Sequence, residues 1–407
     1  TKKGSKKDGF GIRYTGNFTW SSVAETLEQQ ERYGQGQIGA NGGASYTKET
    51  SGSWGPVLDG SPFEAWNGET YAYSKYGNKL KDYFDTGFSQ NHNVSISNGT
   101  ETSHFRASFG ASDNKGVLLN EKLNRINIDL NAGTELNKWM SIDGKISLSR
   151  TKAEDRPEYG TYGAINQLMG IPHNVRLDDL KQYSTEDAVH VNWYGPSAEI
   201  RNPYYVLHQR HNSDERWRAF GYYSTKINFT DWLHLSAKYA FDYYRTRVQN
   251  TNAGDAYNNE TVPSAITDDK MDRGEENFFE SNAEFILMGD RQLTENFRLG
   301  FTLGSNFMYQ KFESLSAGVG NMLTKGEWMF NAANLLRTAA ETGKERAMNS
   351  VFGSVQMAWK EYLSLDLTAR NDWSSTLPKQ NNSFFYPSAN LSFVISDFMK
   401  SIDKSLP

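Results

Sequence analysis

Hydrophobic and polar residues alternate along most of this chain. In segment 11–20 the even positions carry Ile, Tyr, Gly, Phe and Trp, and the odd positions carry Gly, Arg, Thr and Asn. A period of two is typical of a β-strand, whose successive side chains point to opposite faces. The pattern predicts twelve strands, at about 9–24, 88–99, 101–112, 123–135, 139–151, 215–229, 232–247, 276–290, 296–311, 347–359, 362–373 and 382–396.

Alternation by itself fits two kinds of protein. In a soluble sandwich the apolar face forms the core and the polar face meets water. In an outer-membrane barrel the apolar face meets lipid and the polar face lines the lumen. The strand pattern leaves both possibilities open.

The connections between the predicted strands favour the membrane barrel. Turns of a few residues, such as 136–138 and 230–231, alternate with long loops at 25–87, 152–214, 248–275 and 312–346. Outer-membrane barrels have short periplasmic turns and long extracellular loops, whereas long loops are uncommon in compact soluble domains. We therefore predict an all-β fold, a transmembrane antiparallel β-barrel whose long loops face outside.

An aromatic residue follows each of four short turns. These residues are Trp139, Trp232, Phe297 and Tyr362. Aromatic rings with a polar edge favour the headgroup level of a bilayer, and barrels carry such belts at both interfaces. The four rings are predicted to form one interfacial girdle; cross-strand packing in a large soluble sheet is the alternative.

Composition narrows the class of protein further. The chain has 407 residues, 14% of them aromatic, but only 37% hydrophobic, and its mean hydropathy is −0.70. No apolar run approaches the roughly 20 residues that a spanning helix needs, so a helical membrane protein is excluded. There is no cysteine for disulfides or thiolate chemistry. The net charge of −5 gives no reason to expect nucleic-acid binding.

Several segments resemble one family of outer-membrane proteins. The start at 1–4, the hairpin through 91–108 and the stretch 201–205 leading to 230–233 carry part of the likeness. The most specific motif contains Asn371, Asp372, Trp373, Ser374, Ser375, Pro378, Tyr386 and Pro387. In these segments the chain resembles the SusC/RagA family of TonB-dependent outer-membrane transporters.

The resemblance implies a barrel of about 22 strands filled by an N-terminal plug. Residues 1–8 would be the end of the plug or its linker, and residues 9–407 the first part of the barrel, with about twelve of its strands; the chain would be an internal piece of a longer polypeptide. The family implies energy-dependent import of oligosaccharides or oligopeptides, with a SusD-like lipoprotein lid, contact with TonB through segments absent here, and a dimer of such pairs.

Aromatic residues in the two longest loops are candidates for contact with a ligand or partner. They are Trp54, Trp66, Tyr71, Tyr73, Trp193, Tyr194 and Tyr204. Flat rings beside amide and hydroxyl groups suit sugars and peptides equally. The alternative is that these rings pack the loops onto one another and onto the lid protein.

Other motifs give weaker signals. The acidic residues Asp268, Asp269, Asp272, Glu275 and Glu276 could supply oxygen ligands to Ca²⁺ in an outer loop, although their spacing lacks EF-hand order and a solvated acidic loop explains them as well. No nucleophile elbow or ordered triad is recognisable, so no enzymatic role is predicted. A surface adhesin or structural outer-membrane β-protein is the alternative function, and a surface polysaccharide hydrolase would need a carboxylate pair that the sequence does not single out.

Overall fold

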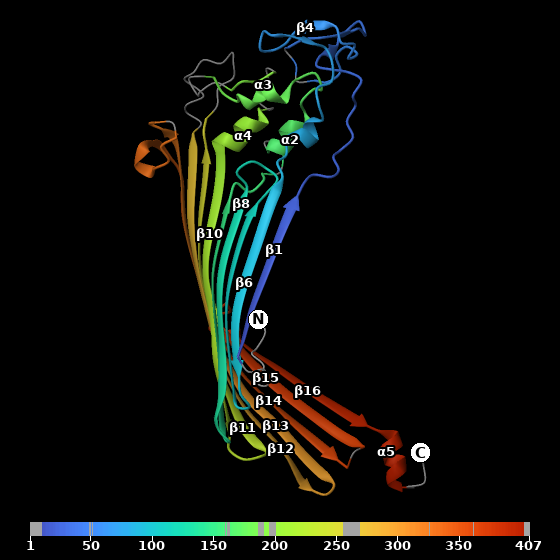
Figure 1. Ribbon diagram of the computed structural model, residues 1–407. Coiled ribbons are helices and arrows are strands. Elements are labelled where there is room, and N and C mark those ends of the chain that lie inside the picture. Colours follow the sequence, from blue (N-terminus) through green and yellow to red (C-terminus); the bar gives the residue numbers. More distant parts are fainter. Residues whose placement is uncertain are drawn as a thin grey trace.

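Twelve long strands form one antiparallel sheet in which each pairs with the next long strand along the chain (Figure 1). The computed structural model describes residues 10–48, 50, 52–158, 160, 163–185, 191–194, 201–254, 269–324, 326–360 and 362–402. The strands are β1 (Gly11–Ser21), β6 (Gly87–Gly99), β7 (Ser103–Lys115), β8 (Lys122–Asn137), β9 (Met140–Glu154), β10 (Arg210–Asn228), β11 (Leu233–Asn252), β12 (Lys270–Thr294), β13 (Phe297–Met322), β14 (Ala333–Trp359), β15 (Leu363–Ser374) and β16 (Ser383–Phe393). The predicted strands and their neighbour order are confirmed; the segment 1–8 lies outside the described residues.

Several strands are longer than the sequence predicts. The expected loop 312–346 is mostly strand, because β13 runs to Met322 and β14 begins at Ala333. The expected loop 248–275 likewise contains the end of β11 and the start of β12. Apolar alternation marks only the part of a strand that meets lipid, whereas the backbone ladder continues past it into water. The two loop predictions were therefore wrong at these ends.

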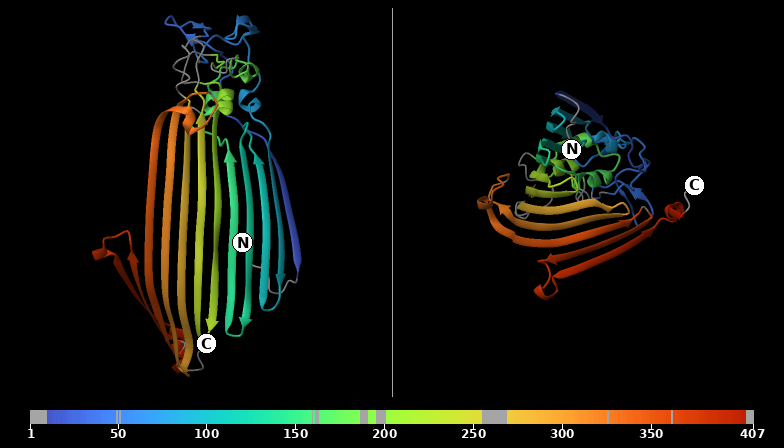
Figure 2. Two further views of the ribbon diagram at one scale, coloured as in Figure 1. Left: turned by 90° about the vertical axis from the view of Figure 1, so that its left-hand side faces the viewer. Right: turned by 90° about the horizontal axis from the view of Figure 1, so that it is seen from below.

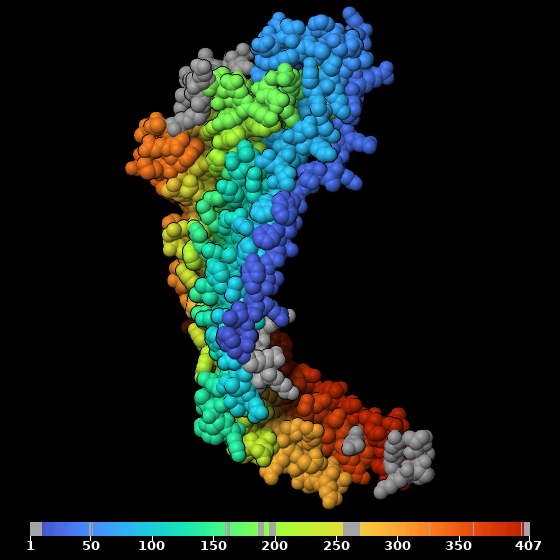
Figure 3. Space-filling model, in the orientation of Figure 1, coloured from blue at the N-terminus to red at the C-terminus, as the bar shows by residue number. Residues whose placement is uncertain are grey.

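The sheet is curved, like half of a barrel wall. In Figure 1 it is seen edge-on, with β15 and β16 turning toward the right, so the hollow side faces right. Figure 2 shows the strands running side by side, and the space-filling view in Figure 3 shows the same hollowed side. Side chains on the inside of a curve converge, and the buried polar residues of the wall, such as Ser95, Asn131, Ser147 and Ser350, belong to that face.

The two longest connections fold together above the open end of the wall (Figure 1). The first, between β1 and β6, contains β2 (Gln37–Ile38), β3 (Ala44–Ser45), β4 (Pro62–Glu64), β5 (Thr70–Ala72) and α1 (Lys79–Asp82). The second, between β9 and β10, contains α2 (Ala164–Met169), α3 (Leu177–Lys181) and α4 (Pro203–Gln209). We call residues 22–86 and 155–209, together with the β7–β8 turn, the outer domain. Its core contains Leu80, Leu118, Leu168, Leu180 and Tyr205.

The other end of the wall carries a short helix that the sequence pattern missed. A strand is predicted to continue to residue 396, but β16 ends at Phe393 and α5 (Ile395–Ile402) follows. Its apolar residues recur at three- and four-residue steps, and Phe398 packs 5.3 Å from Tyr362 between ring centroids. Two single-turn helices, η3 (Phe330–Ala332) and η4 (Lys379–Asn381), complete the elements.

In the part of the chain that the structure describes, no helix has both the length and the apolar character to cross a membrane.

Candidate functional site

The outward face of the wall is apolar and open. Leu148, Tyr243, Phe285 and Leu303 all point to this face, and their exposed fractions lie between 40% and 56%. Along β11 the apolar positions run from Leu233 to Tyr243, which is about 33 Å at the rise of a β-strand. With the usual tilt of about 40° this becomes about 25 Å, the height of the lipid-facing band of outer-membrane barrels.

The four predicted girdle residues lie in or directly beside the short turns at one end of the wall. Trp139 lies in the β8–β9 turn and is 53% exposed. Trp232 lies in the β10–β11 turn beneath the Arg291 guanidinium, 5.4 Å from its ring centroid. Phe297 is the first residue of β13, 6.4 Å from Trp359 between ring centroids, and Tyr362 directly precedes β15. All four are therefore at the same end of the wall, and their role as a membrane girdle stays a prediction.

The hollow face carries a polar network. Tyr222 donates a hydrogen bond of 2.5 Å to the Asp143 carboxylate, whose other oxygen lies 3.1 Å from His104 Nε2. On the same strand as Asp143, Ser147 donates to Asp129 of the neighbouring strand β8 at 2.5 Å. Since these groups face the inside of the curve, they would line the lumen of a closed barrel.

Beside this network, aromatic rings and cations alternate across the hollow face. The Arg216 guanidinium lies 4.6 Å above the Tyr244 ring, which stacks on Phe278 at 4.9 Å. Arg218 pairs with Asp242 at 2.5 Å and also lies over Phe220. The sequence analysis did not single out these residues, although they occupy the polar positions of the alternating strands. Flat rings beside cations can contact the carboxylates and rings of a passing solute.

The predicted ligand-contacting aromatics separate into two groups. Tyr73, Trp193 and Tyr194 are at most 3% exposed and pack inside the outer domain, as the packing alternative describes. The other four are not fully buried: Trp66 and Tyr204 pack against the core, Tyr71 lies beneath Arg176, and Trp54 is 58% exposed beside Tyr33. Contact of these residues with a ligand or partner stays a prediction. Trp54 is the best placed of the seven for such contact, because its side chain is the most exposed.

Gln35 ties the two long connections together. Its side-chain amide donates to Thr50 O at 2.8 Å and to Tyr194 O at 3.0 Å, and its backbone N–H donates to Asn174 Oδ1 at 2.6 Å. The next residue, Gly36, has φ of +146°, and a Cβ there would lie 2.2 Å from a backbone oxygen. The glycine-rich run 34–39 is therefore a site of close backbone packing within the outer domain.

A lysine is buried at the base of this domain. Lys79 is 2% exposed, and burial lowers its pKa to about 7. Burial also lowers the pKa of His173, and the positive charge of Lys79 adds to that shift. Because two bases share this region, protonation of one disfavours protonation of the other.

The family motif forms the tip of the β15–β16 hairpin. Asn371 donates to Ser383 Oγ at 2.9 Å across the pair, and Arg370 donates to both Asp372, at 2.7 Å, and Ser350, at 2.9 Å. The Ser375 hydroxyl accepts a bond of 2.8 Å from the Ala347 N–H on β14. Trp373 pairs with Ser383, and Pro387 pairs with Ala369 in the register, while Ser374, Pro378 and Tyr386 complete the hairpin. Within the described chain the motif connects β14, β15 and β16.

Three of the five acidic residues predicted as possible Ca²⁺ ligands have other partners. Asp269 accepts from the Gly254 N–H, Asp272 lies 3.6 Å from Arg337, and Glu275 pairs with Arg245 at 2.5 Å. Asp268 lies outside the described residues, and Glu276 points to the opposite face from Glu275. Among the residues that are described, no group of three or more such ligands could hold a metal ion.

Comparison with known proteins gives two kinds of likeness. The chain is 24% identical over 353 residues to a TonB-dependent receptor P3 of Formosa agariphila, a match that covers 83% of this chain and 34% of the relative. In structure it is similar to the RagAB peptide importer in its closed-closed state, with a TM-score of 0.69, 17% identity and coverage of 98% of this chain and 46% of that one. A second structure, of the RagAB peptide transporter, gives a TM-score of 0.65.

No family model matches the chain. The chain spans about a third of the length of the curated relative and less than half of the similar structures. The motifs, the sequence match and the shared twelve-stranded wall agree with one another. The chain therefore has the fold of part of an outer-membrane β-barrel, and it is similar in sequence to a TonB-dependent receptor and in structure to the RagAB importer.

Proposed function

We propose that the chain forms the first part of the wall and mouth of an importer of bulky nutrients, oligopeptides or oligosaccharides. Transport would be energised through TonB, and a SusD-like lipoprotein would close the mouth. The observation that carries the proposal is the outer domain, which stands above the hollow, polar side of the wall (Figures 1 and 3). A solute entering the barrel would pass this domain and then the ring and cation surface around Arg216 and Tyr244.

The geometry favours transport over a soluble adhesin. An adhesin built on a large soluble sheet needs its apolar faces covered, because a large contiguous apolar surface is costly in water. In the described chain the outward face exposes Ile126, Leu130, Tyr243 and Phe285, and the outer domain lies at the end of the wall. A structural outer-membrane role would explain the apolar face but not the polar interior.

Cargo class can be tested by uptake. Cells that carry or lack the full-length gene would be given labelled oligopeptides or labelled oligosaccharides, each with and without a functional TonB. We expect the gene to raise accumulation of one class, and loss of TonB to abolish that gain. Accumulation that is independent of TonB, or absent for both classes, would refute the proposal.

Trp54 provides a second test within the outer domain. Trp54→Ala is expected to lower uptake several-fold, because its ring is 58% exposed at the mouth. Trp217→Ala is a matched control, since Trp217 is 56% exposed but lies on the outward face of β10. Equal uptake by the two variants would remove Trp54 from the transport path.

A further inference from the structure

A charged band crosses the outward face of the wall just above its apolar part. Lys152, Glu215, Arg247, Glu275 and Leu315 are register partners on five successive strands, β9 to β13. Two residues closer to the short turns, the next row of register partners contains Arg150, Trp217 and Arg245. The row after that is apolar from β9 to β12 and includes Leu148, Tyr243 and Phe279. Rows lie about 6.6 Å apart along a strand. The charged rows therefore begin at the level where lipid tails end.

Positive charge exceeds negative charge in this band on β9 to β12. Glu275 is shared by two arginines, at 2.5 Å from Arg245 and 3.2 Å from Arg247. Arg273 donates to neutral oxygens, Gln249 Oε1 at 3.1 Å and Trp328 O at 2.9 Å. Arg150 and Lys152 pair with Glu215 and Glu154. Five cations thus meet three carboxylates, and two positive charges remain uncompensated within the band.

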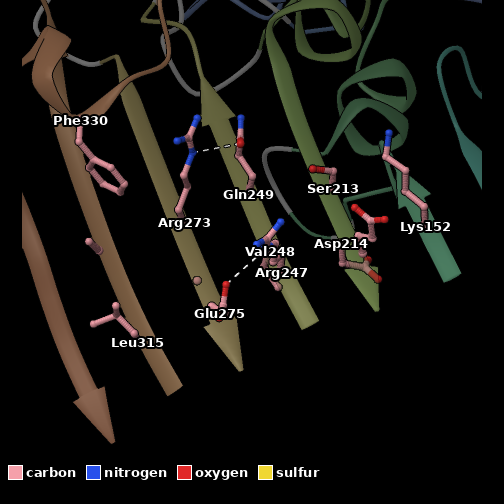
Figure 4. A pocket seen from close by; sticks show the side chains of 13 residues that line it. Lys152, Ser213, Asp214, Arg247, Val248, Gln249, Arg273, Glu275, Leu315 and Phe330 are labelled. Carbon is pink, nitrogen blue, oxygen red and sulfur yellow. Dashed lines mark hydrogen bonds and ion pairs between the residues drawn. The ribbon is translucent and has the colours of Figure 1, made fainter. Parts of the chain in front are cut away.

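The band contains an open cavity of about 570 Å³ (Figure 4). Arg247, Arg273 and Lys152 line it together with Glu215 and Glu275. Asp214, which also lines it, pairs with Arg156 at 2.7 Å. On its left side in Figure 4, Leu315 and Phe330 give the cavity an apolar wall.

Phe330 is held in place by the connection between β13 and β14. The Arg273 guanidinium lies 5.6 Å from the Phe330 ring centroid. Trp328 packs on a small core of Met271, Val319 and Met322, each at most 4% exposed. In Figure 1 this connection (orange) lies on the left of the sheet, whereas the outer domain extends to the right, over the hollow side. The cavity wall is thus a packed part of the fold on the outward face.

We propose that this cavity binds the headgroup of a phosphorylated glycolipid in the outer leaflet. A lipid whose chains lie along Leu148, Tyr243 and Phe279 would place its headgroup against the arginines. Guanidinium groups bind phosphate through paired, charge-assisted hydrogen bonds. A basic pocket at headgroup level is the arrangement by which membrane proteins retain anionic lipids. The proposal concerns the outward face and is independent of the cargo.

Lipid binding can be measured on the full-length protein in detergent by native mass spectrometry. The probes are diphosphorylated lipid A, the same lipid with both phosphates removed, and inorganic phosphate. We expect the diphosphorylated lipid to bind at least about tenfold more tightly than the dephosphorylated lipid. Saturation of the site by millimolar inorganic phosphate alone would assign it to a free anion and overturn the lipid proposal.

The double variant Arg247→Gln, Arg273→Gln tests the cavity itself. It is expected to weaken diphosphorylated lipid binding at least about tenfold, because two charge-assisted contacts are lost. Lys311→Gln is the control, since Lys311 is a cation on the same face that pairs with Glu313 at 2.7 Å outside the cavity. Heat-dependent gel migration confirms that each variant forms a barrel. Unchanged binding by the folded double variant, or an equal loss of binding in Lys311→Gln, would overturn the proposal.

Discussion

The wall and the outer domain of this chain use the same residue types in opposite ways. On the wall, large apolar side chains such as Phe285 point outward and are exposed, and small polar ones such as Ser147 are buried on the hollow side. In the outer domain Leu180 and Tyr205 are fully buried, as in any soluble protein. Burial of apolar side chains therefore identifies a core only when the surrounding solvent is known. Lipid covers the apolar side chains of the wall, so they need no protein core. The outer domain is surrounded by water, so its apolar side chains must be buried in a core.

The largest expected effect comes from the core of the outer domain. Tyr194 is 1% exposed and its hydroxyl donates to Gly170 O at 3.2 Å. Tyr194→Ala is expected to destabilise this domain by about 3–5 kcal/mol. Limited proteolysis should then cleave the two long connections rapidly, while heat-dependent migration of the barrel is unchanged. Tyr194→Phe, which keeps the ring, should lose only about 1 kcal/mol.

A variant Tyr194→Ala that resists protease as well as the parent would show that the outer domain is held mainly by the wall. The wall and the outer domain would then not be independently stabilised regions.

A charge in the middle of the lipid-facing band tests the wall. Phe285 pairs with Ala237 on β11, halfway along the apolar segment, and is 46% exposed. Phe285→Arg is expected to destabilise the barrel in lipid by about 2–4 kcal/mol. Its neighbour Glu284 points to the hollow side, so Glu284→Arg should have a much smaller effect. Urea unfolding in lipid vesicles measures both; a larger effect for Glu284→Arg would reverse the assignment of the faces.

Lys79 gives the outer domain a pH dependence of its own. Its pKa is about 7 when folded and about 10.4 when unfolded, so between these values the unfolded chain binds more protons. Stability of the domain should therefore rise with pH from about 7 to about 10, with a slope of at most about 1.4 kcal/mol per pH unit. Lys79→Met should remove this rise and stabilise the domain at neutral pH.

The slope can be followed by protease resistance of the outer domain at a series of pH values, with protease activity calibrated on an unfolded substrate. An unchanged slope in Lys79→Met would assign the titration to another group.

The smallest expected effect is at the family motif. Ser375→Ala removes the acceptor of the 2.8 Å bond from the Ala347 N–H and should cost about 1 kcal/mol. Ser375→Thr keeps the hydroxyl and is expected to remain close to the parent. Hydrogen exchange at Ala347 measures the change. Equal protection in both variants would show that the strand ladder alone holds this hairpin.

The strands of the wall could be predicted from the sequence. Alternation at positions such as 11–20 and 351–359 gave the twelve strands and their order, because a strand's period of two is imposed by backbone geometry alone. The motif from Asn371 to Pro387 also indicated a resemblance to the SusC/RagA family, and the fold of the chain is similar to that of the RagAB importer. The positions that face lipid and those that face the lumen follow from the same period.

The tertiary structure alone decided where the strands end and what the aromatics do. Beyond Tyr243 the outward side chains become charged, so the pattern fades although the backbone ladder continues to Asn252. Trp54 and Tyr194 look alike in sequence, yet Tyr194 is enclosed by the meeting of two connections and Trp54 is not. Such enclosure depends on segments more than a hundred residues apart, as the bond from Gln35 to Tyr194 illustrates. Local periodicity carries no information about contacts of that range.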